Sequence, residues 1–361
     1  MRALVLTGKN EPLVLQERPD LRVSEGEALV RIYAAALNHR DIWIQKGQYA
    51  GLKYPIVPGS DGSGVVVGIG GKGGVSEGVR SSVSEGTENG GKESWIGKEV
   101  IINPALNWGN FPSHQDQKLF RILGLPDDGT FAEYVKVPVT NLTEKPAHLS
   151  FEEAAAIPLA GVTAYRAVFT RAQLRIVTGG AGTGSTGEKV LITGIGGGVA
   201  LFALQYAVAA GAEVYVTSGS EEKIQKAIAL GARGGVNYTQ GNWGAVLQEM
   251  AGSFDVIVDG AAGEGFDELL NLAAPGGRLT FYGATRGNPS SLVARRIFWK
   301  QLTILGSTMG NPEDFRSMNH FVNQHTLRPV VDKVFPFAEG EAAFRWMDDA
   351  RQFGKIVLKI R

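Results

Sequence analysis

Hydrophobic and polar positions alternate in short runs over residues 1–70, and this pattern predicts β-strands. The runs cover residues 2–7, 12–18 and 28–36, whereas residues 38–47 have the spacing of a helical turn. The first part of the chain is therefore expected to be a mostly β domain with one short helix.

Residues 54–64 are rich in proline and glycine, which predicts a folded-over turn leading into a strand. Residues 71–94 are rich in glycine, serine and glutamate and have almost no large apolar residues. Because such a composition cannot bury enough surface to order itself, a mobile surface loop is expected there. Strands are expected at residues 97–103 and 130–137, on either side of a loop-rich lobe, residues 104–129.

A helix is expected to begin at Ser150, which forms a capping box with Glu153, and Pro158 interrupts it. A second helical segment is expected over residues 159–172. Residues 178–187 form another glycine-rich insert, which superficially resembles a phosphate-binding loop. It lacks the Gly-Lys-Ser/Thr sequence that a P-loop requires, so we interpret it as a flexible loop.

From residue 188 onward, short apolar runs alternate with stretches at helical spacing. The expected strands are centred on Leu191, Tyr215, Val236, Ile257, Thr280 and Ile304. Six strands with helical crossovers predict a doubly wound parallel sheet of the Rossmann type. Beyond it we expect a helix near residues 313–323, a strand near Val330, a helix at 339–350 and a last strand at 355–360. The last strand is expected to rejoin the N-terminal β domain, because chain ends often lie together.

A glycine-rich turn, residues 194–198, directly follows the first of these six strands, and the helical pattern after it ends at Gly211. A strand, such a turn, a helix and a second strand form the context that a dinucleotide fingerprint requires. The glycines allow a sharp turn and a close approach to a pyrophosphate, and the helix N-terminus attracts the phosphates. The spacing Gly194-x-x-Gly197-x-x-Ala200 is one residue longer in its first step than the commonest form. We interpret this stretch as a dinucleotide-binding site.

The end of the second strand indicates which dinucleotide is bound. An NAD-specific site usually places an acidic residue there to hold the ribose 2′-hydroxyl, and this strand runs into Thr-Ser-Gly-Ser instead. Ser218, Ser220 and Lys223 offer hydroxyls and a cation that suit a 2′-phosphate, so NADPH is favoured over NADH. Ser220 as a helix N-cap and Lys223 as a solvated surface charge is the simpler alternative, and both interpretations can hold together.

Composition excludes several classes of function. The 361 residues carry 36 lysine and arginine against 36 aspartate and glutamate, so no basic excess indicates nucleic acid or an anionic membrane surface. The absence of cysteine excludes disulfides, thiolate nucleophiles and cysteine-based zinc sites. The N-terminal residues lack the pattern of a secretory signal, and no apolar run reaches membrane-spanning length. A soluble cytoplasmic protein is expected.

Taken together, these pieces resemble the medium-chain dehydrogenase/reductase superfamily over nearly the whole chain. The matching motifs are Asn38-His39-Arg40-Asp41, Pro58-Gly59-Ser60-Asp61-Gly62-Ser63-Gly64, Gly129-Thr130-Phe131-Ala132-Glu133-Tyr134 and Ala160-Gly161-Val162-Thr163-Ala164-Tyr165, with the glycine turn. The resemblance implies an α/β fold with two domains. Residues 1–150 and 318–361 would form a GroES-like, mostly β catalytic domain, and residues 151–317 a Rossmann NADPH-binding domain.

Zinc alcohol dehydrogenases of this superfamily use a cysteine before the catalytic helix and a His-Glu pair after the proline-glycine turn. Those places hold Asn38, Ser60 and Asp61 here, and the lobe at residues 104–129 has no cysteine for a structural zinc. Asparagine and serine are poor zinc ligands, so no metal is expected. His39 and His114 have no close histidine partner in the sequence and are interpreted as surface or hydrogen-bonded residues.

The chain is more similar to the zinc-independent quinone oxidoreductases, the zeta-crystallin-like branch. That resemblance gives Asn38, Asp41 and Tyr49 as candidate catalytic residues. Asp41 is interpreted as an orienting or helix-start residue rather than a base, and Tyr49 either lines the substrate cleft or simply packs on a loop. The resemblance gives as candidate cofactor-binding residues Thr163, Gly194, Gly197, Gly198, Val199, Ser218, Gly219, Ser220, Lys223, Tyr238, Gly260, Gly283, Met309, Gly310 and Lys355.

An NADPH site without a catalytic metal favours hydride transfer to a quinone or an α,β-unsaturated carbonyl, because these acceptors are already electrophilic. Tyr49 or the cofactor ribose would bond the substrate oxygen, with Asn38 as a second donor. Two alternatives stay open, namely a zinc-independent alcohol or carbonyl dehydrogenase and a non-enzymatic NADPH-binding sensor. The resemblance also implies a homodimer, formed where the strand at residues 302–307 leaves an open sheet edge.

Overall fold

The computed structural model describes residues 1–71, 95–176 and 187–361. The two glycine-rich inserts predicted as mobile or flexible loops lie outside the described residues, apart from Gly71 and Gly187. The chain divides into two compact units. The first unit contains residues 1–159, 331–351 and 355–361, and the second contains residues 160–330 and 352–354.

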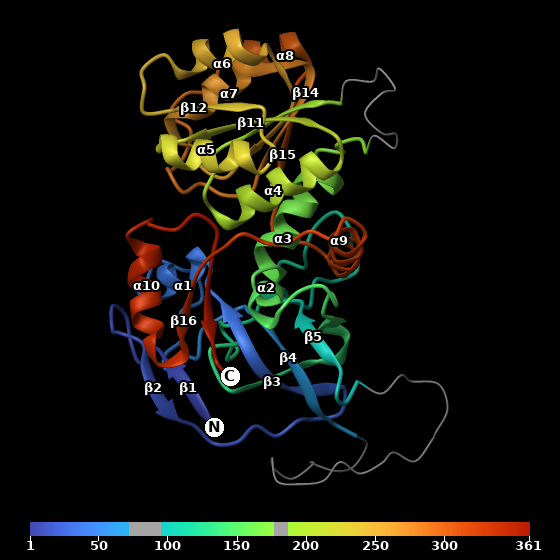
Figure 1. Ribbon diagram of the computed structural model, residues 1–361, viewed down its shortest axis with the longest axis vertical. Coiled ribbons are helices and arrows are strands. Elements are labelled where there is room, and N and C mark those ends of the chain that lie inside the picture. The colour runs from blue at the N-terminus through green and yellow to red at the C-terminus, as the bar shows by residue number, and fades with distance from the viewer. Residues whose placement is uncertain (72–94, 177–186) are drawn as a thin grey trace. The chain divides into compact units, whose positions relative to one another are not determined.

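The first unit is built on a seven-stranded sheet with the order β16-β17-β3-β4-β5-β9, and β8 pairs with β3 (Figure 1). The strands are β16 (Val331–Pro336), β17 (Lys355–Lys359), β3 (Glu27–Ala36), β4 (Asp61–Ile69), β5 (Glu99–Ile102), β9 (Leu142–Glu144) and β8 (Tyr134–Pro138). Strand β17 pairs antiparallel with β3, which confirms that the last strand rejoins the N-terminal β domain.

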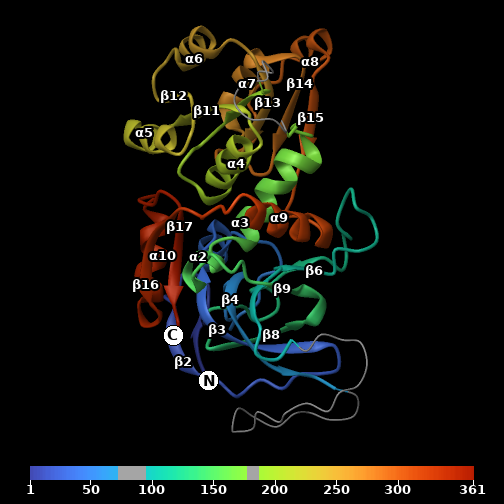
Figure 2. The ribbon, with the colours of Figure 1, turned by 45° about the vertical axis from the view of Figure 1, so that its right-hand side comes forward.

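Short elements surround this sheet (Figure 2). They are the hairpin of β1 (Arg2–Val5) and β2 (Val14–Glu17), the pair β6 (Ala105–Leu106) and β7 (Arg121–Ile122), the helices α1 (His39–Gln45), α2 (Phe151–Ala155) and α10 (Gly340–Asp348), and the 3-10 turns Val139–Asn141 and Phe337–Glu339. One apolar cluster packs β1, α1 and α10 against the sheet, with Leu4, Ile32, Phe131, Phe344 and Ile356 among its buried members. The predicted mostly β domain with one short helix in residues 1–70 is confirmed.

Strand β8 begins at Tyr134, four residues later than the alternation predicts. The backbone amides of Thr130 and Phe131 instead bond the carbonyls of Gly59 and Pro58, at 2.9 and 3.1 Å. Thr130 and Phe131 are therefore tied to the proline-glycine turn, and Glu133 accepts the amide of Ile32 in β3 just before β8 begins.

The second unit is built on a six-stranded parallel sheet with the order β12-β11-β10-β13-β14-β15. Its strands are β12 (Gly234–Asn237), β11 (Glu213–Ser218), β10 (Lys189–Ile192), β13 (Phe254–Asp259), β14 (Ala273–Phe281) and β15 (Thr303–Gly306). Each contains the centre predicted from the sequence, and the doubly wound sheet is confirmed. The strand order reverses at β10, which is where such sheets bind their ligands.

Helix α3 (Pro158–Tyr165) begins at the end of the first unit and continues into the second. The other helices of the second unit are α4 (Gly198–Ala209), α5 (Glu221–Ala229), α6 (Trp243–Ala251), α7 (Phe266–Leu272), α8 (Ala294–Lys300) and α9 (Pro312–Gln324), with a 3-10 turn at Gly263–Gly265. Pro158 interrupts the helix begun at Ser150 and then starts α3, a position where its missing N–H costs nothing. The predicted helical segment at residues 159–172 is thus α3 followed by a π-helical turn, Arg166–Arg171.

Residues 151–159, 318–330 and 352–354 fall in the other unit than the expected division gives them. Helix α2 lies in the first unit, because Ala155 packs with Ala36 and Val357 in one small cluster. Helix α9 lies in the second unit, where the ring of Phe321 contacts the rings of Tyr165 and Tyr206. The side-chain contacts of these two helices therefore decide the division.

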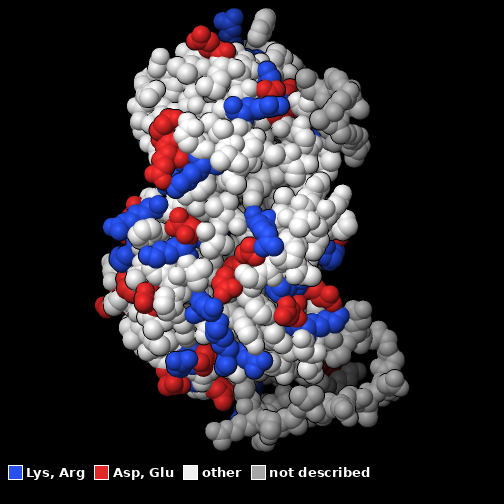
Figure 3. Space-filling view, in the orientation of Figure 1, with Lys and Arg blue, Asp and Glu red and all other residues white. Residues whose placement is uncertain are grey.

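Charged side chains of both signs are interspersed on the face shown in Figure 3, as the balanced composition suggests. Within the described ranges, no helix combines the length and apolar character needed to cross a membrane.

Candidate active site and cofactor site

Three neighbouring strands of the first unit bring distant parts of the sequence to one point. Strand β3 ends at Ala36, and its antiparallel neighbours β4 and β17 begin beside that end, because Ala36 pairs with both Asp61 and Val357. Asn38 follows β3 as the residue before α1, Asp61 opens β4 and Lys355 opens β17. Sheet register alone therefore gathers an amide, a carboxylate and an ammonium.

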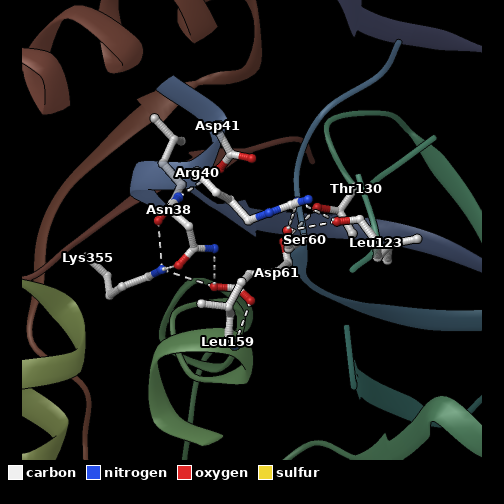
Figure 4. Close-up of polar contacts among 10 residues, drawn as sticks. Asn38, Arg40, Asp41, Ser60, Asp61, Leu123, Thr130, Leu159 and Lys355 are labelled. Atoms are coloured by element: carbon white, nitrogen blue, oxygen red, sulfur yellow. Dashed lines mark hydrogen bonds and ion pairs between the residues drawn. The ribbon is translucent and has the colours of Figure 1, made fainter. Parts of the chain in front are cut away.

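These three side chains form a closed hydrogen-bonded group, here named the Lys355 cluster (Asn38, Asp61 and Lys355; Figure 4). Lys355 Nζ donates to Asp61 Oδ2 at 3.0 Å, to Asn38 Oδ1 at 2.8 Å and to the carbonyl of Leu37 at 2.7 Å. Asn38 Nδ2 donates to Asp61 Oδ2 at 2.9 Å, and the amide of Leu159 donates to Asp61 Oδ1 at 2.8 Å. All three side chains are buried, so the ion pair is shielded from water.

The resemblance gives Lys355 as a candidate cofactor-binding residue, and the structure places its ammonium in the Lys355 cluster. An ammonium has three N–H donors, and Leu37, Asn38 and Asp61 accept all three. A direct bond from Lys355 to a cofactor would require one of these bonds to break. Its position instead makes Lys355 a member of the candidate active site.

The residues at this point do not fit a zinc ion. Zinc sites use thiolate, imidazole and carboxylate ligands, whereas the places of the ligands hold Asn38, Ser60 and Asp61. The Asp61 carboxylate is already paired with the ammonium of Lys355, and the Ser60 hydroxyl donates to the carbonyl of Leu123 at 2.8 Å. Across residues 1–71, 95–176 and 187–361, nowhere do three histidine, cysteine or acidic side chains gather in a way that could hold a metal.

Asp41 lies in the first turn of α1 and is completely buried. Its Oδ2 accepts the backbone N–H of Asn38 at 2.8 Å, whereas its Oδ1 has no partner among the described residues. Burial raises the pKa of Asp41 to about 6, and the nearby Arg40 guanidinium and the Asn38 amide oppose this rise. A side chain enclosed in this way positions Asn38 and the helix start.

Tyr49 is half-buried against the core of the first unit and lies beside Arg40. Arg40 Nε donates to the Tyr49 hydroxyl at 3.4 Å, and the guanidinium carbon lies 5.0 Å from the ring centroid. Arg40 Nη1 donates to Ser60 Oγ at 2.7 Å and to the carbonyl of Leu123 at 2.9 Å. Sequence reasoning had not singled out Arg40, although its place between Asn38 and Asp41 was a signal.

His39 and His114 are exposed, and the ring of His114 lies 2.8 Å from the hydroxyl of Ser113. The interpretation of both as surface or hydrogen-bonded histidines is confirmed.

The glycine turn of the second unit has the backbone that its sequence predicts. Gly194 and Gly196 have φ of +63° and +118°, a region that favours glycine, and Gly197 is the N-cap of α4. The amides of Gly198 and Val199 open α4, where N–H groups have no acceptor within the helix. These residues fit the phosphates of a dinucleotide.

The candidate 2′-phosphate residues lie together at the end of β11. Ser218 Oγ lies 3.3 Å from the carbonyl of Ile195 and accepts the amide of Ser220 at 3.3 Å. A Cβ on Gly219 would lie 3.0 Å from the Tyr238 hydroxyl, and one on Gly196 would lie 2.8 Å from Cδ of Lys223. The side chains of Tyr238 and Lys223 are therefore brought to this turn.

Ser220 also caps α5, because its Oγ accepts the amide of Lys223 at 3.4 Å, so the N-cap interpretation is confirmed. Sequence reasoning missed one cation here. The side chain of Arg286 is exposed, and its guanidinium carbon lies 5.0 Å from the centroid of the Tyr238 ring.

The remaining candidate cofactor residues occupy positions where backbone segments approach closely. A Cβ on Gly283 would lie 2.9 Å from the carbonyl oxygen of Gly260, which places the ends of β13 and β14 together. A Cβ on Gly310 would lie 2.4 Å from the side chain of Val162, next to Thr163 in α3. Met309 is buried with φ of +48°.

Comparisons with known proteins agree with this architecture. The family described as "Alcohol dehydrogenase GroES-like domain" matches residues 24–147, and "Zinc-binding dehydrogenase" matches residues 198–324. The chain is 32% identical over 349 residues to the "Zinc-type alcohol dehydrogenase-like protein YogA" of Leptosphaeria maculans, covering 92% of this chain and 90% of that protein. The chain belongs to the medium-chain dehydrogenase/reductase superfamily.

Other relatives carry different names. The "Acryloyl-coenzyme A reductase" of Sulfurisphaera tokodaii is 26% identical, with coverage of 99% of this chain and 100% of that protein. The "Quinone oxidoreductase-like protein 2" of Bos taurus is also 26% identical, covering 100% and 93%. A solved "NAD-dependent alcohol dehydrogenase" is 36% identical, with a TM-score of 0.85 and 100% of both chains covered. The chain is thus an oxidoreductase of this superfamily, and its Rossmann domain binds a nicotinamide dinucleotide.

Proposed function

We propose that the protein is an NADPH-dependent, zinc-independent reductase of quinones or α,β-unsaturated carbonyls. The observation that carries the proposal is the Lys355 cluster, in which an ammonium neutralises the carboxylate at the place of the zinc ligands. Because this donor set does not suit a Lewis-acidic metal, the acceptor must be electrophilic by itself. Quinones and enones meet this requirement.

The residues of the first unit have separate roles in the proposed reaction. The cofactor, when bound, supplies a hydride with its electron pair. The Tyr49 hydroxyl bonds the substrate oxygen and keeps its own proton available, because it accepts rather than donates in its bond with Arg40. One N–H of Asn38 is engaged by Asp61, and the other is left for the substrate. Asp41 and Lys355 hold Asn38 in place.

The names of two relatives support this acceptor class. An acryloyl group is an α,β-unsaturated carbonyl, and quinones are cyclic conjugated diones. Hydride addition to either places negative charge on an oxygen. A site that binds and orients such an acceptor needs few chemical groups of its own.

The cofactor proposal rests on the end of β11. Ser220 offers a hydroxyl there, with no acidic side chain at the strand end, and Lys223 and Arg286 supply positive charge, whereas the buried Ser218 hydroxyl already donates to Ile195. This arrangement suits a 2′-phosphate better than a 2′-hydroxyl. The solved relative named as NAD-dependent makes a direct comparison of the two cofactors necessary.

The test measures oxidation of NADPH and of NADH by an ortho-quinone, each with and without a strong chelator. We expect NADPH to be preferred and the chelator to have no effect. Lys223→Gln should raise KM for NADPH about 10-fold and leave KM for NADH unchanged. Lys226→Gln is the matched control on the same helix, because Lys226 pairs with Glu222 on the surface. An NADH preference, or loss of activity with the chelator, would contradict the proposal.

The two alternatives give different results in the same assay. The name of the solved alcohol dehydrogenase relative supports the dehydrogenase alternative, and if that enzyme is zinc-independent, oxidation of an alcohol that a chelator does not affect is expected. An NADPH-binding sensor would bind the cofactor without turnover of any acceptor.

We also propose a homodimer that pairs two copies along β15. Among the described strands β15 has one neighbour, β14, so its other edge is open. The adjacent helix α8 exposes Phe298 and Trp299, with 61% and 74% of their surfaces accessible. Light scattering should report twice the mass of 38.5 kDa. Ile304→Pro should yield a monomer, because Ser307 donates to Phe281 of β14 and the alternation along the strand turns the amide of Ile304 to the open edge.

A further inference from the structure

We infer that Arg40 is a catalytic residue, whose Nη2 group donates hydrogen bonds to the substrate oxygen on which negative charge develops. The inference rests on the proposed reduction of a quinone or an enone and names the group that replaces a Lewis acid in it.

Three of the five N–H donors of Arg40 have partners within the protein. Nε donates to the Tyr49 hydroxyl, and Nη1 donates to Ser60 Oγ and to the carbonyl of Leu123. The two N–H groups of Nη2 have no acceptor among the described residues. Arg40 as a whole is only 5% exposed, yet Nη2 is not among the fully enclosed atoms that lack a partner, so solvent reaches this end of the side chain.

The charge of Arg40 is also not cancelled by a direct ion pair. No carboxylate of the described residues lies within 4.0 Å of its guanidinium nitrogens. Asp41 is the next residue, but its Oδ2 accepts the backbone amide of Asn38 and makes no bond with the guanidinium. A guanidinium remains protonated in proteins. Arg40 is therefore a largely buried positive charge whose two unused N–H donors, on Nη2, are accessible to solvent or to a ligand.

The planar guanidinium directs these donors beside Tyr49. In arginine, the Nε–H bond and one Nη2–H bond are parallel, as the two prongs of a fork. Because the Nε prong holds the Tyr49 hydroxyl, an oxygen on the Nη2 prong lies next to that hydroxyl. The contacts of Nη1 with Ser60 and Leu123 fix the plane of the fork, so the donors are preorganised.

The chemical step then balances within the proposed reaction. The hydride forms a C–H bond at the electrophilic carbon of the acceptor, and the displaced π electrons move onto the oxygen as an enolate or hydroquinone anion. Arg40 stabilises this anion but cannot supply a proton, because its pKa is too high. The proton comes from the Tyr49 hydroxyl, which solvent then reprotonates.

The first test compares Arg40→Gln and Arg40→Lys with the native protein in quinone or enone reduction. We expect kcat/KM to fall about 10²–10³-fold in Arg40→Gln, with cofactor affinity unchanged. Lysine should recover little, because a point charge cannot reproduce the fork. Added guanidinium ion should restore part of the turnover of Arg40→Ala. A purely structural role would show unchanged turnover per folded molecule or no rescue, and either result would overturn the inference.

Arg31→Gln is a matched control in the same unit. The Arg31 guanidinium carbon also lies near a tyrosine ring, 5.7 Å from the centroid of Tyr33, but it takes no part in the candidate site. Its replacement should leave kcat/KM within about twofold of the native value.

A second measurement does not depend on turnover. The probe is 4-nitrophenol, whose phenolate form is coloured, added to the full-length protein with saturating NADP⁺. We expect the apparent pKa of the bound probe to be lowered by about 1 unit or more, and this shift to vanish in Arg40→Gln. An unshifted pKa in the native protein would refute the anion site even if quinones are reduced. A shift without turnover of any acceptor would support the anion site and refute the proposed function.

Discussion

Among the described residues, each unit has a deeply buried ion pair, and the two pairs have similar hydrogen-bond partners. In the first unit Asp61 accepts from Lys355, Asn38 and the amide of Leu159. In the second unit, Asp314 accepts from the Arg166 guanidinium, the hydroxyl of Thr170 and the amide of Asn311. Both carboxylates have three donors, and both cations are less than 5% exposed.

The two pairs differ in what surrounds them. Asp314 fastens α9 to the π-helical turn after α3, and its neighbours are further structural contacts, such as the ring of Phe321 against Tyr165. Lys355 bonds both Asp61 and Asn38. Arg40 follows Asn38 by two residues in α1, and its Nη2 has no acceptor among the described residues. Burial and pairing alone therefore do not indicate chemistry, whereas an unused donor beside the pair does.

The largest effect is expected for Lys355→Met, which leaves the Asp61 carboxylate buried without its cation. The free energy of unfolding should fall by about 3–5 kcal/mol. The variant should also lose about 10²-fold in kcat/KM per folded molecule, because Asn38 loses the bond that fixes its amide. Urea unfolding and steady-state kinetics measure both effects. Full activity in the folded fraction would show that the Lys355–Asp61 pair stabilises the fold only, as the Arg166–Asp314 pair does.

Arg166→Met should cost a similar free energy of unfolding, about 3–5 kcal/mol, for the same physical reason. Turnover per folded molecule at saturating cofactor should stay unchanged, in contrast to Lys355→Met. Replacing Asp314 by leucine in the same chain should recover much of the stability, because an apolar pair leaves no charge unpaired. If Arg166→Met lost as much turnover per folded molecule as Lys355→Met, the two pairs would not differ in function.

A smaller, pH-dependent effect is expected at Asp41, whose pKa burial raises to about 6, in part against the charges of Arg40 and Lys355. The folded state binds this proton more tightly than the unfolded state, so native stability falls as the pH rises from about 4 through 6. Asp41→Asn removes that dependence. Relative to the native protein, the variant should gain about 1.4 kcal/mol between pH 5 and pH 8 in urea unfolding. A constant difference across this range would show that Asp41 is not buried as described.

The smallest effect is expected at the exposed pair of Lys226 and Glu222 on α5. Water screens this pair, so Glu222→Gln should not measurably change the urea midpoint or the turnover. A clear loss would indicate that ion pairs stabilise this protein in a way that burial does not explain.

Local patterns in the sequence were enough to predict the second unit. Each strand of a parallel sheet covered on both faces is a short apolar run, and the glycine turn after β10 follows from phosphate and backbone geometry. The division between the units was less predictable, because α9 is assigned by side-chain contacts with residues far away, such as Phe321 with Tyr206. The spacing of apolar residues in α9 predicts a helix but does not indicate which residues the helix packs against.

The candidate site was predicted only in part. Asn38, Asp41 and Tyr49 lie in one region because they are close in sequence, on and beside α1. Lys355 was assigned to the cofactor because its sequence neighbours suggested it, whereas sheet register places it on Asp61, 294 residues away. Arg40 escaped notice because its role depends on which of its donors are used, and that requires coordinates.

Strand β17 lies between β16 and β3 in the sheet, although it is the last strand that the ribosome synthesises. This interior strand and Lys355 emerge only after residues 160–330 have been synthesised, so the nascent chain can fold its nucleotide-binding unit first. The sheet of the first unit is completed last, by a contact that spans 317 residues between Lys355 and Asn38. A product that ends before β17 therefore lacks both an interior strand of this sheet and the ammonium of Lys355.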